Sequence, residues 1–242
     1  MTDWLNPTLD RAACAEAFRS NRHIRIGNIL NTDKAAGVLR SLGEVGEWSL
    51  LCGTEAGTAV IDTREMKGWP REKQAEFQAS LAASGRKGQG FAFLGYRMDD
   101  RWAAGAPDTP LGHFYDALMG PEIRGLVSEI SGYADLNGVS VQATRFGPSH
   151  YLTRHRDDPT QERRRLAFAW GFTPQWHPDW GGLLQFYNDA GAPTLSFAPG
   201  FNTLDIHDID QVQAVTFVAP FAGHVRQAVS GWYLSAPAGP GG

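Results

Sequence analysis

The sequence predicts an α+β protein in which supporting helices precede a double-stranded β-helix, or jelly-roll, barrel. Two observations predict this fold class. In the first half of the chain, apolar residues recur mostly at helical spacing around a few short strands. From Val139 onward, short apolar stretches alternate with Gly, Pro and Asn, which is typical of an antiparallel sandwich or barrel.

The helices of the first half are predicted from their spacing and from their ends. Asn31 can cap the helix that follows a short alternating strand, and Pro70 can open another that ends at Gly85. Gly120 and Pro121 separate two later helices. The predicted helical ranges are 10–18, 35–42, 70–81, 111–119 and 121–130, and the early strand is 23–30.

The strands of the second half are predicted from apolar runs bounded by turn residues, and no internal repeat accompanies them. We expect one domain over residues 1–242. Its helical and strand part is 1–137, its jelly-roll core 138–235, and its Pro- and Gly-rich tail 236–242 is expected to be disordered. The predicted strands are 139–146, 166–172, 183–187, 194–197, 203–206, 212–218 and 225–234.

Composition excludes several classes of function. The chain has 242 residues, of which 42% are apolar, and a net charge of −4, so it does not resemble a nucleic-acid-binding or membrane-surface protein. No apolar run reaches the length of a membrane span, and the first residues lack the features of a signal peptide. Cys14 and Cys52 are too few for a disulfide framework. We therefore expect a cytoplasmic protein with reduced thiols, and nothing indicates its oligomeric state.

The segment His155-Arg156-Asp157 is the most informative motif. In an extended segment, residues two apart point to the same side, so the imidazole of His155 and the carboxylate of Asp157 can converge on one metal ion. With a third ligand from elsewhere, they would form the facial triad of non-haem Fe(II) oxygenases. The motif alone is weak, because it occurs often by chance.

Several motifs follow it in a fixed order. Trp176 to Phe186 contains a Trp-Gly-Gly-Leu-Leu run, Asn202-Thr-Leu comes next, and Arg226 precedes Gly231-Trp232. This order resembles the Fe(II)- and 2-oxoglutarate-dependent oxygenases of the prolyl hydroxylase type. The resemblance is clear over about 100 residues and implies Fe(II) as cofactor, with 2-oxoglutarate and O₂ as cosubstrates.

The resemblance also implies roles for individual residues. His155 and Asp157 match the first two iron ligands, and Arg226 matches the arginine that binds the far carboxylate of 2-oxoglutarate. Ser230 has the same parity as Arg226 along its strand and is a further candidate for 2-oxoglutarate binding. Ala228 stands where the family often has a hydroxyl group.

The chain departs from the family at the second iron-binding histidine. Spacing from Asn202 and spacing from Arg226 both place this ligand at position 213, which is Gln213. Three possibilities stay open: the Gln213 amide ligates weakly or through water; His207 or His224 replaces it; or iron is not held firmly. Asp210 would be the ligand only if the strand slipped by three residues.

The resemblance predicts a dioxygenase that hydroxylates a prolyl or other amino-acid or peptide substrate, which could be a small molecule or a protein. The alternative is a degenerate jelly roll that binds a ligand or protein without turnover, as Gln213 and Ala228 would allow. A cupin-like metal hydrolase or isomerase has little support. We expect the loop 85–108 to shape the entrance, with Phe91, Phe93, Tyr96 and Arg97 as candidate contacts.

Overall fold

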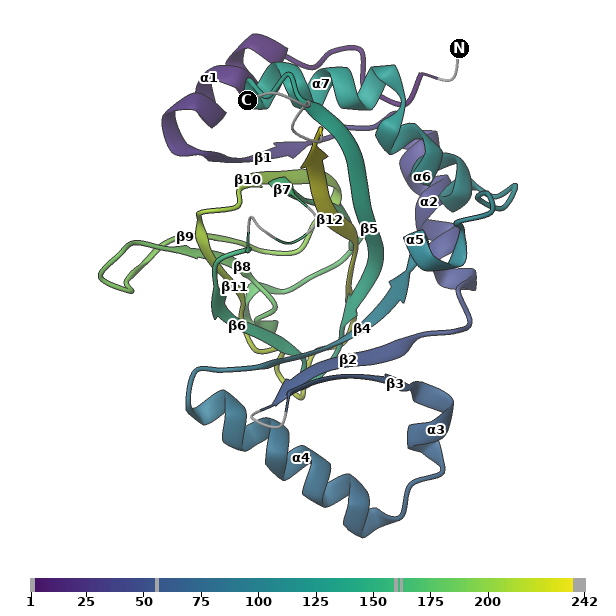
Figure 1. Ribbon diagram of the computed structural model, residues 1–242, viewed down its shortest axis with the longest axis vertical. Helices are drawn as coiled ribbons and strands as arrows, with labels where there is room; N and C mark the ends of the chain where they lie inside the picture. Colours follow the sequence, from purple (N-terminus) through teal and green to yellow (C-terminus); the bar gives the residue numbers. More distant parts are fainter. Residues whose placement is uncertain (1–2, 55–56, 159–160, 162, 237–242) are drawn as a thin grey trace.

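A curled antiparallel sheet of twelve strands, flanked by helices, forms the centre of the computed structural model (Figure 1). The structure describes residues 3–54, 57–158, 161 and 163–236, so most of the predicted tail lies outside the described residues. The predicted α+β jelly roll is confirmed. Within the described part, no helix combines the length and the apolar character needed to cross a membrane. Both cysteines are free thiols.

The strands are β1 His23–Gly27, β2 Ser49–Thr54, β3 Gly57–Asp62, β4 Phe91–Arg97, β5 Leu136–Phe146, β6 Tyr151–His155, β7 Arg164–Phe172, β8 Leu184–Tyr187, β9 Pro193–Phe197, β10 Phe201–Asp208, β11 Val212–Val215 and β12 Arg226–Ser235. The helices are α1 Arg11–Asn21, α2 Thr32–Glu44, α3 Thr63–Lys67, α4 Arg71–Arg86, α5 Met98–Arg101, α6 Pro110–Met119 and α7 Pro121–Ser131, with a 3₁₀ turn at Pro178–Trp180.

Local signals placed α1, α2, α4, α6 and α7, whereas the short helices α3 and α5 were not predicted. The side chain of Asp10 accepts a hydrogen bond from the backbone N–H of Ala13 and so begins α1, and Asn31 caps α2 in the same way through Asp33. Pro110 and Pro121 occupy the first positions of α6 and α7, where a missing N–H costs nothing.

The prediction of a loop over residues 85–108 was wrong, because this segment contains β4 and α5. Gly95 interrupts the apolar pattern of β4 and looks like a turn residue. In the structure it allows close packing, since a Cβ there would lie 2.6 Å from a methyl group of Leu51 on β2. The hairpin of β2 and β3 was likewise not predicted. The strand predicted to run to Val218 leaves the ladder after Val215.

The order of the strands is β1-β10-β7-β12-β5-β4-β6-β11-β8-β9, and β2 and β3 extend the sheet from β4. β4 pairs with β5 on one part of its length and with β6 on another, so the sheet folds back at this strand. We call β1, β10, β7, β12 and β5 the large wall, and β6, β11, β8 and β9 the small wall. The two walls face each other (Figure 1).

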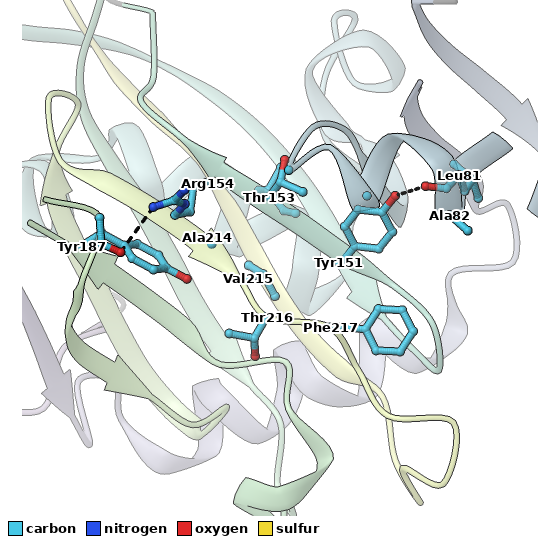
Figure 2. A pocket seen from close by; sticks show the side chains of 14 residues that line it. Leu81, Ala82, Tyr151, Thr153, Arg154, Tyr187, Ala214, Val215, Thr216 and Phe217 are labelled. Carbon is cyan, nitrogen blue, oxygen red and sulfur yellow. Dashed lines mark hydrogen bonds between the residues drawn. The ribbon is translucent and has the colours of Figure 1, made fainter. Parts of the chain in front are cut away.

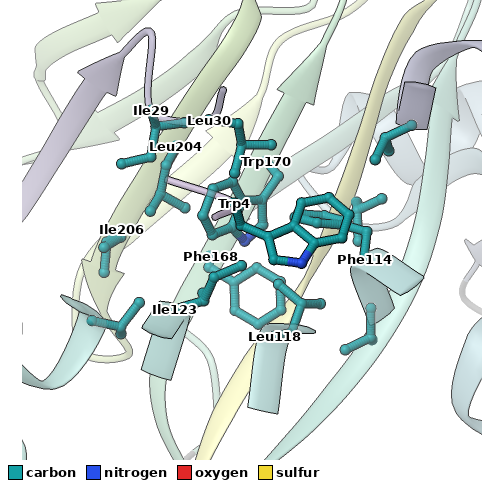
Figure 3. Packing of buried hydrophobic residues seen from close by; sticks show 14 of the residues in the cluster. Trp4, Ile29, Leu30, Phe114, Leu118, Ile123, Phe168, Trp170, Leu204 and Ile206 are labelled. Atoms are coloured by element: carbon teal, nitrogen blue, oxygen red, sulfur yellow. The ribbon is translucent and has the colours of Figure 1, made fainter. Parts of the chain in front are cut away.

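The main hydrophobic core lies outside the large wall, where α1, α2, α6 and α7 cover it (Figures 1 and 3). Phe114 of α6 packs edge-on against Trp170 and Phe172 of β7, with ring centroids 5.3 and 5.8 Å apart. Because side chains alternate along a strand, burying Phe168 and Trp170 on this side turns Ala167 and Ala169 inward. The two small residues leave space between the walls.

Candidate functional site

A cavity of about 700 Å³ lies between the large and the small wall. Its lining is more polar than the outer core, and it contains charged side chains from both walls. The residues of interest that line it are His155, Asp157, His207, Gln213, Asp205, Arg226, Ala228, Ser230 and Trp232. The structure therefore brings His155, Asp157, Gln213, Arg226 and Ser230 together from three separate parts of the chain.

His155 is the last residue of β6, and Asp157 lies two residues further along the chain, outside the strand. The Nδ1 atom of His155 lies 2.9 Å from the backbone carbonyl of Thr153, which requires the proton on Nδ1 and leaves the Nε2 lone pair free. That Nε2 atom is 3.9 Å from Oδ1 of Asp157. Burial raises the pKa of Asp157, an effect that the neighbouring imidazole opposes. Two donor atoms thus converge on one point.

Gln213 lies on β11 directly opposite His155 in the ladder with β6. Its side chain is buried, and its Nε2 donates a hydrogen bond to Oδ2 of Asp157 over 3.0 Å. Its Oε1 lies 2.5 Å from Nε2 of His207 on β10. The amide therefore stands between a carboxylate of the small wall and an imidazole of the large wall.

His207 belongs to the cavity, although the sequence favoured Gln213 over it. Burial lowers the pKa of His207 to about 3, so its imidazole is neutral at pH 7. Asp210 and His224 lie elsewhere. Asp210 is in the turn between β10 and β11, and the ring of His224 lies 5.7 Å from that of Trp180, outside the cavity lining. A slipped strand is excluded by the pairing of Gln213 with His155.

Arg226 is the first residue of β12 and is buried, with its guanidinium at the cavity. Its Nη1 donates to the backbone carbonyl of Gly182 over 3.3 Å, and its Cζ lies 5.3 Å from the centre of the Phe146 ring. Burial lowers the pKa of Arg226 to about 10, which keeps it charged at neutral pH. No carboxylate of the described residues is in ion-pair contact with it.

β12 presents every second residue to the cavity, as the parity predicted: Arg226, Ala228, Ser230 and Trp232. Sequence reasoning did not assign Trp232 to the site, although the same parity would have found it. The indole N–H of Trp232 is buried and makes no hydrogen bond with the described residues. The guanidinium of Arg164 lies 3.6 Å from the centre of the Trp232 ring.

The four candidate entrance residues lie in three different places. Phe91 and Phe93 of β4 line the cavity, and Phe93 stacks on Phe146 with centroids 4.9 Å apart. Arg97 lines a neighbouring cavity of about 520 Å³. Tyr96 was predicted wrongly as an entrance contact, because its ring turns outward and packs against Trp48 and Trp102.

A second cavity, of about 670 Å³, lies on the outside of the small wall beside α4 (Figure 2). Tyr151 donates a hydrogen bond across it to the backbone carbonyl of Leu81 over 2.8 Å, and Arg154 reaches the carbonyl of Gly191. Ala214 of β11 and Thr216, which follows the end of that strand, also line it. None of the predicted site residues lines this outer cavity.

The donor set of the inner cavity is unusual for a metal site. Among the described residues, no group of three His, Cys, Asp or Glu side chains is close enough to share an ion. His155 and Asp157 supply two donors, and the third position holds an amide that can offer only its oxygen. This set fits a divalent cation through one nitrogen and two oxygens. The buried guanidinium of Arg226 fits a carboxylate.

Comparisons with known proteins agree with the expected resemblance. Residues 141–234 match the family model of the 2OG-Fe(II) oxygenase superfamily. A Pseudomonas putida prolyl-4-hydroxylase is 13% identical, with a TM-score of 0.62 over 94% of this chain and 100% of that one. A 2OG-Fe(II) oxygenase family oxidoreductase from Burkholderia pseudomallei is 12% identical, with a TM-score of 0.64 over 94% and 92%.

A third similar structure is a prolyl hydroxylase of Trichoplax adhaerens in complex with a peptide fragment of the hypoxia inducible factor oxygen degradation domain. It is 15% identical, with a TM-score of 0.60 over 93% of this chain and 89% of that one. A comparison with curated protein sequences gave no match. The match to the family model over residues 141–234 and the likeness to these structures together show that the chain has the fold of the 2OG-Fe(II) oxygenases.

Proposed function

We propose that this chain, which has the fold of the 2OG-Fe(II) oxygenases and matches their family model, is an Fe(II)- and 2-oxoglutarate-dependent dioxygenase of the prolyl hydroxylase type. One observation carries the proposal. His155, Asp157 and Arg226 occur in the order of the family and line one cavity between the two walls. A binding protein without turnover is less well supported, because it would not require a metal-type donor pair beside an unpaired buried cation.

In this proposal His155, Asp157 and Gln213 would hold Fe(II), and Arg226 would hold the far carboxylate of 2-oxoglutarate. The bound iron and cosubstrates would supply the oxidising power that no side chain has, converting 2-oxoglutarate and O₂ to succinate and CO₂ as one oxygen atom enters the substrate. The protein's own contribution is position. The hydrogen bond from His155 to Thr153 fixes the ring so that Nε2 faces the cavity.

Arg226 can bind and orient a dicarboxylate. Its guanidinium presents parallel N–H groups that match the two oxygens of a carboxylate, and its burial strengthens this interaction. Ser230 follows Arg226 on the same side of β12, with Ala228 between them, and can donate a further hydrogen bond. The apolar ring of Phe146 and the close-packed walls around Arg226 exclude water from the bound ligand.

For the substrate we propose a prolyl or other amino-acid side chain, free or in a peptide. Two solved structures that resemble this chain are prolyl hydroxylases, and one of them holds a peptide. Phe91, Phe93 and Trp232 give the inner cavity an aromatic lining that suits an apolar ring or aliphatic chain. The composition and the charge of −4 support a cytoplasmic enzyme that acts on neither nucleic acid nor membrane.

Two measurements test the function. Fe(II) and 2-oxoglutarate added without oxygen should give the weak visible charge-transfer band of a chelated complex, and oxygen should then yield succinate. Arg226→Met serves as the matched control and should show neither signal. Binding of 2-oxoglutarate without any succinate, even with candidate substrates present, would instead identify a ligand-binding protein.

A further inference from the structure

The side-chain amide of Gln213 has a polar partner at each of its two ends. Its side chain is 9% exposed and makes one hydrogen bond to Asp157 and one to His207. The two partners come from opposite walls, because Asp157 follows β6 and His207 lies on β10. The amide is therefore held at both of its ends.

The orientation of the amide decides whether Gln213 can bind a metal. In the structure the NH₂ group faces Asp157 over 3.0 Å and the carbonyl oxygen faces His207. An amide NH₂ has no lone pair to give, so only Oε1 can ligate a cation. The two ends of a glutamine amide are nearly equal in size, and a half-turn about the last side-chain bond exchanges them without displacing a neighbour.

After this half-turn the geometry suits a shared cation. Oε1 of Gln213 would then face Oδ2 of Asp157 at about the separation now found between Nε2 and Oδ2, 3.0 Å. A separation of about 3 Å is compatible with two oxygen atoms that ligate one divalent cation. The Nε2 atom of His155, on the opposite strand, approaches the same carboxylate through Oδ1.

The half-turn also reverses the bond to His207. The amide NH₂ would now face Nε2 of His207, which can accept a hydrogen bond if its imidazole carries its proton on Nδ1. An apolar residue at position 207 would leave this NH₂ buried without a partner. A partnerless buried amide N–H costs about 1–3 kcal/mol and would favour the orientation that cannot ligate.

We propose that His207 is a positioning residue that holds the amide oxygen of Gln213 toward His155 and Asp157, which makes Gln213 the third metal ligand. Direct ligation by His207 is disfavoured by the same contacts, because the buried amide of Gln213 stands between the imidazole and Asp157. The inference rests on the proposed function only in taking the metal to be Fe(II). It accounts for a glutamine at this position together with a histidine on the facing strand.

The experiment compares the wild type with His207→Phe, His207→Gln and Gln213→His, all without 2-oxoglutarate. Anaerobic calorimetry with Fe(II) gives the dissociation constant, and X-ray absorption of the loaded protein gives the number of imidazole ligands. We expect one imidazole in the wild type. His207→Phe should weaken Fe(II) binding roughly tenfold, and His207→Gln should restore most of it, because a glutamine oxygen can accept the same hydrogen bond.

Gln213→His supplies the control for folding and for mechanism. It should bind Fe(II) more tightly through two imidazoles, and adding His207→Phe to it should change little, because an imidazole at 213 has no amide group whose orientation His207 could decide. Two imidazoles in the wild type that fall to one in His207→Phe would make His207 the ligand and overturn the proposal. Equal Fe(II) affinity in the wild type and His207→Phe would overturn it too, as would absence of Fe(II) binding in the wild type.

These outcomes are separate from a failure of the proposed function. Iron held through one imidazole, without succinate formation, would leave the role of His207 standing and remove the dioxygenase. Succinate formation by a protein with two imidazole ligands would do the reverse.

Discussion

Asp205 and Arg25 form a two-pronged ion pair across strands β10 and β1, with Nε–Oδ1 and Nη2–Oδ2 distances of 2.6 and 2.7 Å. The two residues are direct partners in the strand register. Asp205 lines the inner cavity and is the carboxylate that most influences Arg226. The ion pair therefore engages this carboxylate with Arg25, and among the described residues no carboxylate is in ion-pair contact with the guanidinium of Arg226.

This arrangement predicts that Arg25, outside the proposed binding contacts, tunes the affinity for 2-oxoglutarate. Arg25→Gln should release Asp205 to attract Arg226 and weaken 2-oxoglutarate binding roughly tenfold, or about 1.4 kcal/mol. Calorimetric titration measures this affinity. Adding Asp205→Asn should restore most of it, because the competing charge is removed. Unchanged binding in Arg25→Gln alone would show that Asp205 does not compete for Arg226.

Removing the charge of Arg226 should have a larger effect. Arg226→Met leaves the carboxylate of 2-oxoglutarate buried without a partner, a loss of about 2–5 kcal/mol and at least roughly a thirtyfold weaker complex. Arg226→Lys should be intermediate, because an ammonium group cannot form two parallel hydrogen bonds. Fe(II) affinity measured without 2-oxoglutarate should stay the same in both. A parallel loss of Fe(II) binding would point to a collapsed cavity.

The sequence predicted those parts of the site that depend on local pattern. His155 and Asp157 follow from parity in one segment, and Arg226 and Ser230 from parity in another. The contact between His207 and Gln213 joins opposite walls, so it depends on how far the sheet curls, and no local pattern encodes that. β4 was missed for a related reason: Gly95 resembles a turn residue until the close approach of Leu51 is known. The outward orientation of Tyr96 was not predicted either, because side-chain directions along β4 can be assigned only once that strand is recognised.

Asn202 belongs to the Asn-Thr-Leu motif, and its role in the structure is to connect two segments of the backbone. It has a φ of +54°, and its buried side chain accepts from the N–H of Leu30 over 2.8 Å and donates to the carbonyl of Leu30 over 2.9 Å. These bonds join the segment between β1 and α2 to the start of β10. Asn202→Gly keeps the backbone conformation but loses both bonds, and should lower the free energy of unfolding by about 1–3 kcal/mol.

Asn202→Ala should cost about 1–2 kcal/mol more than Asn202→Gly, because a Cβ is unfavourable at this φ. Denaturant unfolding followed by tryptophan fluorescence measures the difference. Asn28→Gly is the matched control, since Asn28 also has a positive φ of +50° but is exposed. It should change stability little. Equal stability of the Gly and Ala variants at position 202 would contradict the argument from backbone strain.

Asp99 should make the stability of the fold depend on pH. Its Oδ2 accepts from the backbone N–H of Val141 over 2.6 Å and its Oδ1 from the hydroxyl of Tyr115 over 3.2 Å, which ties α5 to β5 and α6. Burial nevertheless raises the pKa of Asp99 above its ordinary value of 3.8. The folded protein therefore binds this proton more tightly than the unfolded chain does. Its stabilising contribution is complete below the unfolded pKa and is lost as pH rises through the folded pKa.

Asp99→Asn removes this dependence and keeps an oxygen that can accept from Val141. The free energy of unfolding of the wild type, minus that of Asp99→Asn, should fall as pH rises above about 4 and level off above the folded pKa. Urea unfolding at steps between about pH 4 and about pH 8 measures it. Asn28→Gly, an exposed change that removes no titratable group, should give a difference that stays flat in this range. A difference that rises with pH for Asp99→Asn would mean that the hydrogen bonds from Val141 and Tyr115 outweigh the cost of burying the charge.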